Sequence, residues 1–238
     1  MEIYIFLFCH WYLSLFCQTV FLHRYASHNM FKLNIFWEKI FFLATFIFQG
    51  SSFLQPAAYG VMHRNHHTFA DTPKDPHSPA YAKNVFSFNW NTVIEYRKLV
   101  EDFKSGKRDD KDVPRWPLIE NLGESIPTRF TFISLYFYFY LKYTTALWQY
   151  GFLILHILMG PFHGFIVNWF GHKIGYRNFN KLKDNSKNTL PVDFLMMGEL
   201  YQNNHHKYPN NIKFSMKWYE IDFGYWSTLI LKKLKIIN

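Results

Sequence analysis

Four long segments of the chain carry almost no charged side chains. They run from Ile3 to Leu22, from Ile40 to Met62, from Phe130 to Leu141 and from Tyr143 to Gly171. A helix needs about 20 apolar residues to cross the core of a bilayer, and the first segment has that length. The second is interrupted by Gln49-Gly50-Ser51-Ser52. This pattern predicts an all-α protein embedded in a membrane.

A polar segment, Thr68 to Pro127, separates the second apolar segment from the third. Its charge-dense part, Glu101 to Arg115, is typical of a solvated surface. The sequence shows no internal repeat and no low-complexity linker, and 238 residues are too few for two comfortable domains. We therefore expect one domain that covers residues 1–238.

Eight of the 12 histidines lie in four short groups next to the ends of apolar segments. The groups are His23 with His28; His63, His66 and His67; His172; and His205 with His206. On a helix, His63 and His67 are one turn apart and share a face. Four groups at segment ends have no simple packing explanation, so we expect them to share one metal site on one side of the membrane.

This requirement restricts the topology. The segment Ile40–Met62 cannot cross the membrane once, because it would separate the first two histidine groups. It is interfacial or re-entrant, or it crosses twice, and its polar interruption favours the first two alternatives. The part from Phe130 to Asn168 crosses twice, as a helical hairpin that turns near Thr144 to Gln149. We expect about three spans plus interfacial helices, with a helical cap that carries the histidines.

The charges indicate which side the histidines face. The formal net charge is +9, and of the 26 Lys and Arg residues all but Lys142 lie on the histidine side. An excess of Lys and Arg marks the cytoplasmic side of a membrane protein. The positive residues flank spans and line no single groove, which argues against nucleic-acid binding. The short chain favours a multi-pass protein of the bacterial cytoplasmic membrane.

The residue types restrict the metal chemistry. Neutral imidazole binds Fe, Zn, Cu and Ni, and eight ligands are too many for one tetrahedral ion. The helical Glu-x-x-His motif of soluble di-iron proteins is absent, and the only cysteines, Cys9 and Cys17, lie in the first apolar segment. We infer two metals with mainly nitrogen ligands, and the spacing leaves iron and zinc open.

Other polar residues allow two interpretations each. For His10 and His156 a hydrogen-bonded packing role is favoured, whereas His163 is balanced between packing and function. His77 is most simply a loop residue. Three carboxylates are candidates to accept a hydrogen bond from a ligand imidazole, namely Glu199, Asp71 and Asp75. For Asp71 and Asp75, simple surface charge is an equal alternative.

The four groups form recognisable motifs: His-Arg-x-x-x-His, His-Arg-x-His-His, Asn-x-x-x-His and Gly-Glu-x-x-x-Asn-x-His-His. In this order they resemble the membrane acyl-CoA (delta-9 type) fatty acid desaturase family. Further matches are Asp71-Thr72, Asp75-Pro76-His77-Ser78, the stretch Gly171–Arg177 and Trp218-Tyr219-Glu220-Ile221-Asp222. The resemblance extends from about Trp11 to Ile236.

This resemblance implies a di-iron site. One iron would be held by His23, His28, His63, His67 and His205. The other would be held by His66, His172 and His206, with Asn168 reaching it through a water. Two features depart from the family: Gln202 stands where the family commonly has another ligand histidine, and only one span fits before His23.

The resemblance also implies the reaction, an O2-dependent desaturation of a fatty-acyl thioester carried by CoA or by acyl carrier protein. The substrate would lie in an apolar tunnel, and Gln49-Gly50 would mark its bend or a plain helix break. Electrons would come from a ferredoxin, rubredoxin or cytochrome b5-type donor, because the chain carries no dinucleotide or iron–sulfur motif. Alternatives are a related membrane hydroxylase or monooxygenase, a non-catalytic membrane metal-binding protein, and a desaturase impaired at Gln202.

Overall fold

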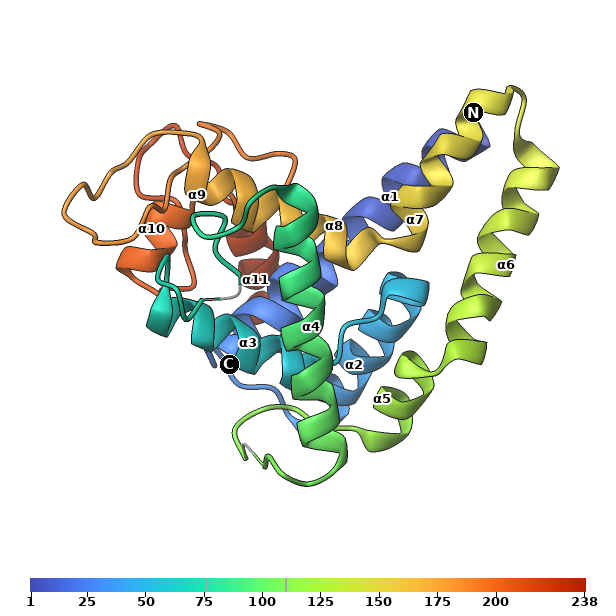
Figure 1. Cartoon of the computed structure of the whole chain (residues 1–238), viewed down its shortest axis with the longest axis horizontal. Helices are drawn as coiled ribbons and strands as arrows, with labels where there is room; N and C mark the ends of the chain where they lie inside the picture. Colours follow the sequence, from blue (N-terminus) through green and yellow to red (C-terminus); the bar gives the residue numbers. More distant parts are fainter. Residues whose placement is uncertain (76, 110) are drawn as a thin grey trace.

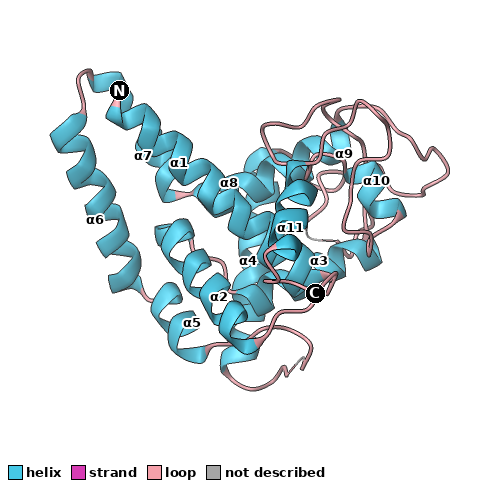
Figure 2. Cartoon of the chain, turned by 180° about the vertical axis from the view of Figure 1, so that it is seen from behind, coloured by secondary structure: helices cyan, strands magenta, loops and turns pink. Residues whose placement is uncertain are grey.

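The computed structural model describes residues 1–75, 77–109 and 111–238, and helices account for the regular structure in these ranges. The helices of the first half are α1 (Glu2–Phe16), the π-helical segment η1 (Cys17–Ser27), α2 (Ile35–Gln49), the 3-10 turn η2 (Gly50–Ser52), α3 (Pro56–Phe69) and α4 (Val85–Lys104). Those of the second half are α5 (Pro117–Glu124), α6 (Ile126–Tyr143), η3 (Leu147–Phe152), α7 (Leu153–Ile157), α8 (Met159–Phe165), η4 (Ile166–Phe170), α9 (Gly171–Lys173), α10 (Gln202–Lys207) and α11 (Phe223–Lys233). The prediction of an all-α fold is confirmed for the described residues, in which only isolated β-bridges occur (Figure 2).

The helices form an arm and a cap. α1 and α7 lie side by side in the arm, whose tip carries the N-terminus, and α6 runs from α5 to this tip (Figure 1). The chain reverses between Tyr143 and Leu147, so the predicted hairpin turn near Thr144 to Gln149 is confirmed. The cap, at the other end, contains α9, α10 and long loops. All four histidine groups lie toward this end.

The second apolar segment folds back on itself. α2 and α3 are bent by 80° across the break between them. Gly50 ends α2 with a φ of 51°, in the left-handed region that glycine adopts without strain. The Gln49 side-chain oxygen then accepts a hydrogen bond from the Leu54 amide at 2.9 Å, and Pro56 begins α3. A bent pair of helices is either a broken span or a re-entrant loop, so the interfacial or re-entrant alternative that the sequence favours stays a prediction.

The last apolar segment is also broken, which the uninterrupted run of apolar residues did not predict. The helices on either side of Leu158 are bent by 77°. Pro161 has no amide hydrogen to offer to the carbonyl of Ile157 four residues earlier. That carbonyl instead accepts a hydrogen bond from the Ser51 hydroxyl at 3.0 Å. The break thus joins this segment to the bend between α2 and α3.

Among the described residues, one continuous helix, Glu2–Ser27, is long and apolar enough to cross a membrane, and counting each bent pair as one span gives up to three. The bent pairs are Ile35–Ser52 with Pro56–Phe69, and Leu147–Ile157 with Met159–Lys173. The predicted crossing at Phe130–Leu141 lies in α6, which is not among these candidates. The predicted number of spans therefore stays a prediction.

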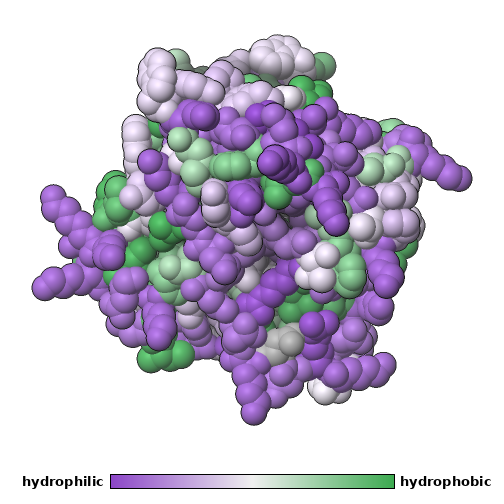
Figure 3. Space-filling model, turned by 90° about the vertical axis from the view of Figure 1, so that its left-hand side faces the viewer, coloured by the Kyte–Doolittle hydropathy of each residue, from purple (hydrophilic) through white to green (hydrophobic). Residues whose placement is uncertain are grey.

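The surface at the cap end is hydrophilic. Seen from the cap end, the molecule is covered mainly by hydrophilic side chains (Figure 3). The stretch Glu101–Arg115 is largely exposed, as predicted for a solvated segment, although Phe103 and Val113 are buried beneath it against α3. Asp110 in this stretch lies outside the described residues.

Candidate metal centre

The local helix geometry aligns the first histidine pair. The amide of His28 bonds to the carbonyl of His23 at 3.3 Å, a spacing of five residues. The wider turn of a π-helix, a feature common at functional sites, places residues five apart on one face. α3 packs against this turn at Gly60, where an added Cβ atom would lie 2.8 Å from the Ala26 carbonyl oxygen. The absence of a side chain at Gly60 therefore lets the second histidine box approach the first.

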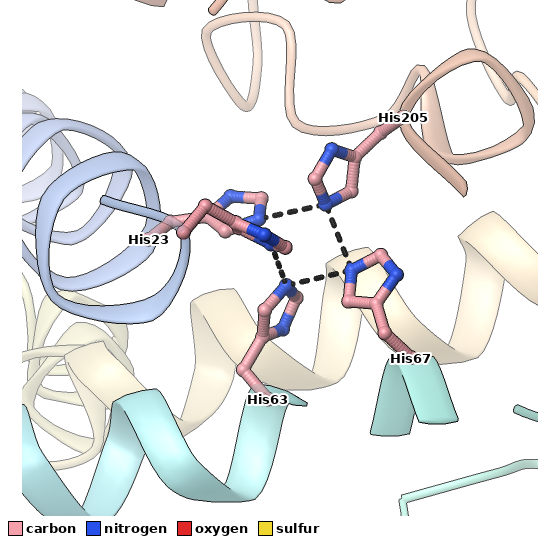
Figure 4. Close-up of side chains that lie close together, drawn as sticks. His23, His63, His67 and His205 are labelled. Carbon is pink, nitrogen blue, oxygen red and sulfur yellow. Dashed lines mark hydrogen bonds between the residues drawn. The ribbon is translucent and has the colours of Figure 1, made fainter. Parts of the chain in front are cut away.

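Five imidazoles from three elements meet at one point (Figure 4). We call them the five-histidine group: His23 and His28 from the end of η1, His63 and His67 from α3, and His205 from α10. The Nε2 atom of His63 lies 2.9 Å from that of His28 and 3.0 Å from that of His67. The Nε2 atom of His205 lies 3.0 Å from that of His23 and 2.9 Å from that of His67. Every contact joins two Nε2 atoms.

Hydrogen bonds among the rings cannot account for this arrangement. An Nε2 atom of a neutral imidazole either carries a hydrogen and donates, or lacks one and accepts. The Nε2 atoms of His63 and His205 each have two Nε2 neighbours, so the contacts cannot all be good hydrogen bonds. Burial holds the pKa of His205 well below its ordinary value, so its ring stays neutral. Converging imidazole nitrogens fit a metal ion at their centre.

A three-histidine group lies beside the first. His66 from α3, His172 from α9 and His206 from α10 have ring centroids 4.9–5.1 Å apart. The Nε2 atoms of all three are buried, and the described residues offer them no hydrogen-bond partner. Leaving a buried polar nitrogen unpaired costs about 1–3 kcal/mol. A second metal ion would satisfy all three atoms together.

Carboxylates fix the orientation of these three rings. The Nδ1 atom of His66 lies 2.8 Å from Asp75, that of His172 lies 2.8 Å from Asp71, and that of His206 lies 3.1 Å from Asp184. A carboxylate at Nδ1 holds the proton there and leaves the Nε2 lone pair for a metal. The structure thus decides between the alternatives for Asp71 and Asp75 in favour of pairing with histidine. Sequence reasoning missed Asp184, which belongs to none of the motifs.

The imidazoles also affect these carboxylates. Burial by itself raises the pKa of Asp184, but the hydrogen bond and charge of His206 outweigh it and bring the pKa below its ordinary value. Burial also raises the pKa of Asp71, and the hydrogen bond and charge of His172 bring that pKa below its ordinary value. Both groups are therefore carboxylates, and both accept the Nδ1 hydrogen.

Among the described residues the five-histidine group has one carboxylate partner, Glu199, which bonds the Nδ1 atom of His23 as predicted. Glu199 in turn accepts a hydrogen bond from Arg24 at 2.8 Å. Arg24 is fully buried, stacks over Phe214 at 4.0 Å and bonds Asp222 at 3.1 Å. This charged network ties η1 to the loop before α10 and to the start of α11, so it holds His23 and His205 together.

Asn168 and Gln202, the two further candidates at the second metal, are held by different contacts. The Asn168 amide nitrogen donates to the Gly164 carbonyl at 2.8 Å and contacts His77. The Gln202 amide nitrogen donates to the Glu199 carbonyl at 2.7 Å. Both side chains are buried, and each has its oxygen as the remaining acceptor. Neither contact tests ligation.

The prediction that His77 is a loop residue is confirmed, but the residue is not exposed. His77 lies in the loop between α3 and α4, but its ring is buried and packs 5.6 Å from the ring of His66. Burial lowers the pKa of His77 to about 3, so the ring is neutral. The Asp75-Pro76-His77-Ser78 motif was the signal that could have found it. Pro76 lies outside the described residues.

Three further histidines lie away from this centre. The Nδ1 atoms of His10 and His156 are 2.7 Å apart, and His156 also bonds the Tyr140 hydroxyl at 3.1 Å. These contacts agree with the predicted hydrogen-bonded packing role. His163 is fully buried against Trp11, and neither of its ring nitrogens has a partner.

A mainly apolar cavity of about 500 Å³ adjoins the centre. Its wall includes His63, His77 and Asn168 from the histidine end. Elsewhere the wall is formed by Leu54, Met62, Phe88, Leu158 and Phe165 together with polar residues such as Glu124 and Arg129. A volume of this size is typical of a small-molecule site.

Comparison with known proteins agrees with this geometry. A profile of the fatty acid desaturase family matches residues 3–226. The hex-5-enoyl-(acyl-carrier protein) acetylenase of Moorena producens (strain JHB) is 29% identical over 95% of this chain and 73% of its own length. The delta-9 desaturase-like 5 protein of Arabidopsis thaliana is 30% identical, over 86% and 65%. The icosanoyl-CoA 5-desaturase of Limnanthes douglasii is 28% identical, over 92% and 58%.

The chain thus spans between 58% and 73% of the length of these three relatives. The matched residues include all four histidine boxes. The chain therefore belongs to the fatty acid desaturase family, whose members are oxidoreductases that act on fatty-acyl chains.

Proposed function

We propose that the chain is a single-domain, O2-dependent fatty-acyl desaturase that inserts a double bond with two irons bound by its histidines. The observation that carries this proposal is the convergence of eight imidazoles into two groups, in each of which the ligand atoms lie within 4.8 Å of one another. The eight are His23, His28, His63, His67 and His205 for one iron and His66, His172 and His206 for the other. Asn168, through a water, and the oxygen of Gln202 are additional candidates at the second.

Iron bound there would supply the activation of O2 and the oxidising power that side chains lack. The chain's own residues would bind the iron and orient the imidazole rings that hold it. Carboxylates hold hydrogen on Nδ1 of His66, His172 and His206, so that Nε2 stays unprotonated. Because these rings are buried or nearly so, bulk water has little access to the site.

The cavity is the proposed binding site for the acyl chain. An acyl chain is apolar, and the cavity wall offers Leu54, Phe88 and Phe165 for contact. Because His63 and Asn168 line the same cavity, a chain inside it would pass close to both histidine groups. Fixing one pair of methylenes there would determine the position of the double bond. We place the proposed bend of the substrate next to Gln49-Gly50, since Ser52 and Leu54 after it also line the cavity.

The proposed acyl carrier and electron donor rest on the names of two relatives and on the positive charge of the cap. One relative is named for an acyl-carrier-protein substrate and another for an acyl-CoA substrate, so we propose an acyl thioester for this chain. The cap is basic, with lysines such as Lys181, Lys183 and Lys187, which suits the phosphates of CoA or an acidic carrier or donor protein. We propose a ferredoxin, rubredoxin or cytochrome b5-type donor, and a bacterial cytoplasmic membrane with the cap facing the cytoplasm.

The test is expression of the chain in a host without desaturases of its own. We expect new double bonds in the fatty acids, located by mass spectrometry, and none with His172→Ala at equal protein level. A hydroxylated product would favour the monooxygenase alternative instead. Membrane protein that binds metal but leaves the lipids of the host unchanged would favour the non-catalytic alternative.

A further inference from the structure

His77 is held from two sides by residues of different helices. Its Nδ1 atom lies 3.1 Å from the hydroxyl of Thr92 on α4, and its Nε2 atom contacts the side-chain nitrogen of Asn168 on η4. The ring thus connects two elements that flank the cavity. The proposed ligand set does not include His77.

The hydrogen bonds in this chain of contacts can run in one direction only. The Asn168 amide nitrogen lies 2.8 Å from the Gly164 carbonyl, which is an acceptor, so the atom there must be nitrogen and not oxygen. Its second hydrogen faces the Nε2 atom of His77, which therefore accepts.

The remaining hydrogens follow from this assignment. With Nε2 accepting, the neutral His77 ring carries its hydrogen on Nδ1 and donates it to Thr92. The Thr92 hydroxyl donates in turn to the Phe88 carbonyl at 3.0 Å. Backbone carbonyls of α4 and α8 thus accept the hydrogen bonds at the two ends of this chain of contacts, and each hydrogen has one acceptor.

These hydrogen bonds fix the orientation of the Asn168 amide. Its nitrogen is fully used, so Oδ1 is the atom left for a ligand. A water bound to a metal ion points both of its hydrogens away from the metal and donates them to acceptors. Such a water needs the oxygen of an amide, and a flipped amide would present N–H to it.

We propose that His77 is a positioning residue that fixes the amide of Asn168 with Oδ1 toward the water of the three-histidine metal. The inference rests on the proposed function, because it assigns a partner to the Asn168 of that site. It adds a role for a side chain outside the eight ligands.

Two substitutions test the roles of the two ring nitrogens of His77 separately. In His77→Gln, the side-chain amide reaches the position of Nε2 and its oxygen can accept from Asn168. In His77→Asn, the shorter amide reaches the position of Nδ1, keeps the bond to Thr92 and leaves Asn168 without its acceptor. Both remove the ring, so a purely structural role predicts similar effects for the two variants.

The experiment loads the full-length chain with iron in detergent and measures iron retained against increasing chelator. Asn168→Ala serves as the reference, and thermal unfolding of the metal-free variants reports on the fold. We expect His77→Asn to weaken iron retention about tenfold, as Asn168→Ala does, which is the effect typical of losing a partner of a metal ligand. His77→Gln should stay close to the parent, and His77→Asn should add little when combined with Asn168→Ala.

Equal losses in the two His77 variants, or no loss in His77→Asn, would overturn the positioning role while leaving the di-iron proposal intact. If Asn168→Ala retained iron like the parent, the water-mediated role of Asn168 would be wrong, and the role of His77 with it. Failure of the parent chain to bind iron at all would instead refute the proposed function.

Discussion

The two histidine groups differ in how their rings are supported. In the part of the chain that the structure describes, only His23 of the five-histidine group has a carboxylate partner, whereas each ring of the three-histidine group is hydrogen-bonded to an aspartate. Five nitrogens nearly complete the coordination of one ion, but three leave positions open. A carboxylate makes its imidazole a stronger ligand, so it offsets a smaller number of ligands. The comparison leads us to expect that the five-histidine group would hold a metal by the number of its ligands. The three-histidine group would hold one by the orientation of its rings, with coordination positions left for O2 or water.

Ligand removal should expose this difference most strongly. His172→Ala leaves two nitrogens in its group, so we expect loss of about half of the bound iron and no detectable desaturated product. His28→Ala leaves four nitrogens in the other group, and we expect it to retain most of its iron and measurable activity. Metal analysis of purified protein, together with fatty-acid analysis, checks both variants. Equal losses would contradict the proposed distinction between number and orientation.

The buried arginine should matter more for folding than any carboxylate of the three-histidine group. Arg24→Met leaves Glu199 and Asp222 buried without their cation, which costs about 3–5 kcal/mol. We expect the free energy of unfolding of the metal-free chain to fall by that amount, measured by denaturant titration of its helical circular dichroism. The exposed Lys233→Met is the control, with a change within about 0.5 kcal/mol. A loss as small as that of the control would show that the network does not stabilise the fold.

Partner carboxylates should affect metal binding selectively. Asp184→Asn removes the charge behind His206, and we expect iron affinity at the three-histidine group to fall about 10- to 100-fold. Glu199→Gln acts on one ring of five, so its effect on iron affinity should be smaller than its effect on stability. Competition with a chromogenic chelator measures the affinities. The account fails if Glu199→Gln releases iron more readily than Asp184→Asn at equal folding.

The smallest effect is expected at Gln202. Gln202→His offers the three-histidine group a fourth ring, which should increase iron retention. Because the existing rings are already oriented by carboxylates, we expect the rate of desaturation to change by less than about tenfold, or 1.4 kcal/mol. Comparison of product formed per chain in the two forms measures this. Activity that exists only in Gln202→His would mean that the natural chain is an impaired desaturase.

Much of the centre was predictable because its chemistry is concentrated in local motifs. The division into His23, His28, His63, His67 and His205 on one side and His66, His172 and His206 on the other follows the family resemblance, and the folded chain brings the same sets together. The all-α fold and the turn near Thr144 follow from uncharged segments whose length and polarity are directly visible.

What the sequence did not predict depends on long-range contacts. Asp184 lies in a polar loop, and only folding brings it to His206. The burial of the loop residue His77 was not predicted, because it is produced by α4 and η4, which are distant in sequence. The break at Leu158 depends on a carbonyl of Ile157 that Ser51 satisfies from another segment. Such tertiary partners leave no periodic signal in the chain.

Metal analysis of the purified chain shows whether the eight histidines bind two irons. The protein, prepared in detergent and loaded anaerobically with ferrous iron, should retain two irons per chain that can be oxidised and reduced again. His66→Ala should retain close to one, because the five-histidine group is left intact. Retention of a single redox-inactive zinc by the parent, or of no metal, would contradict the account.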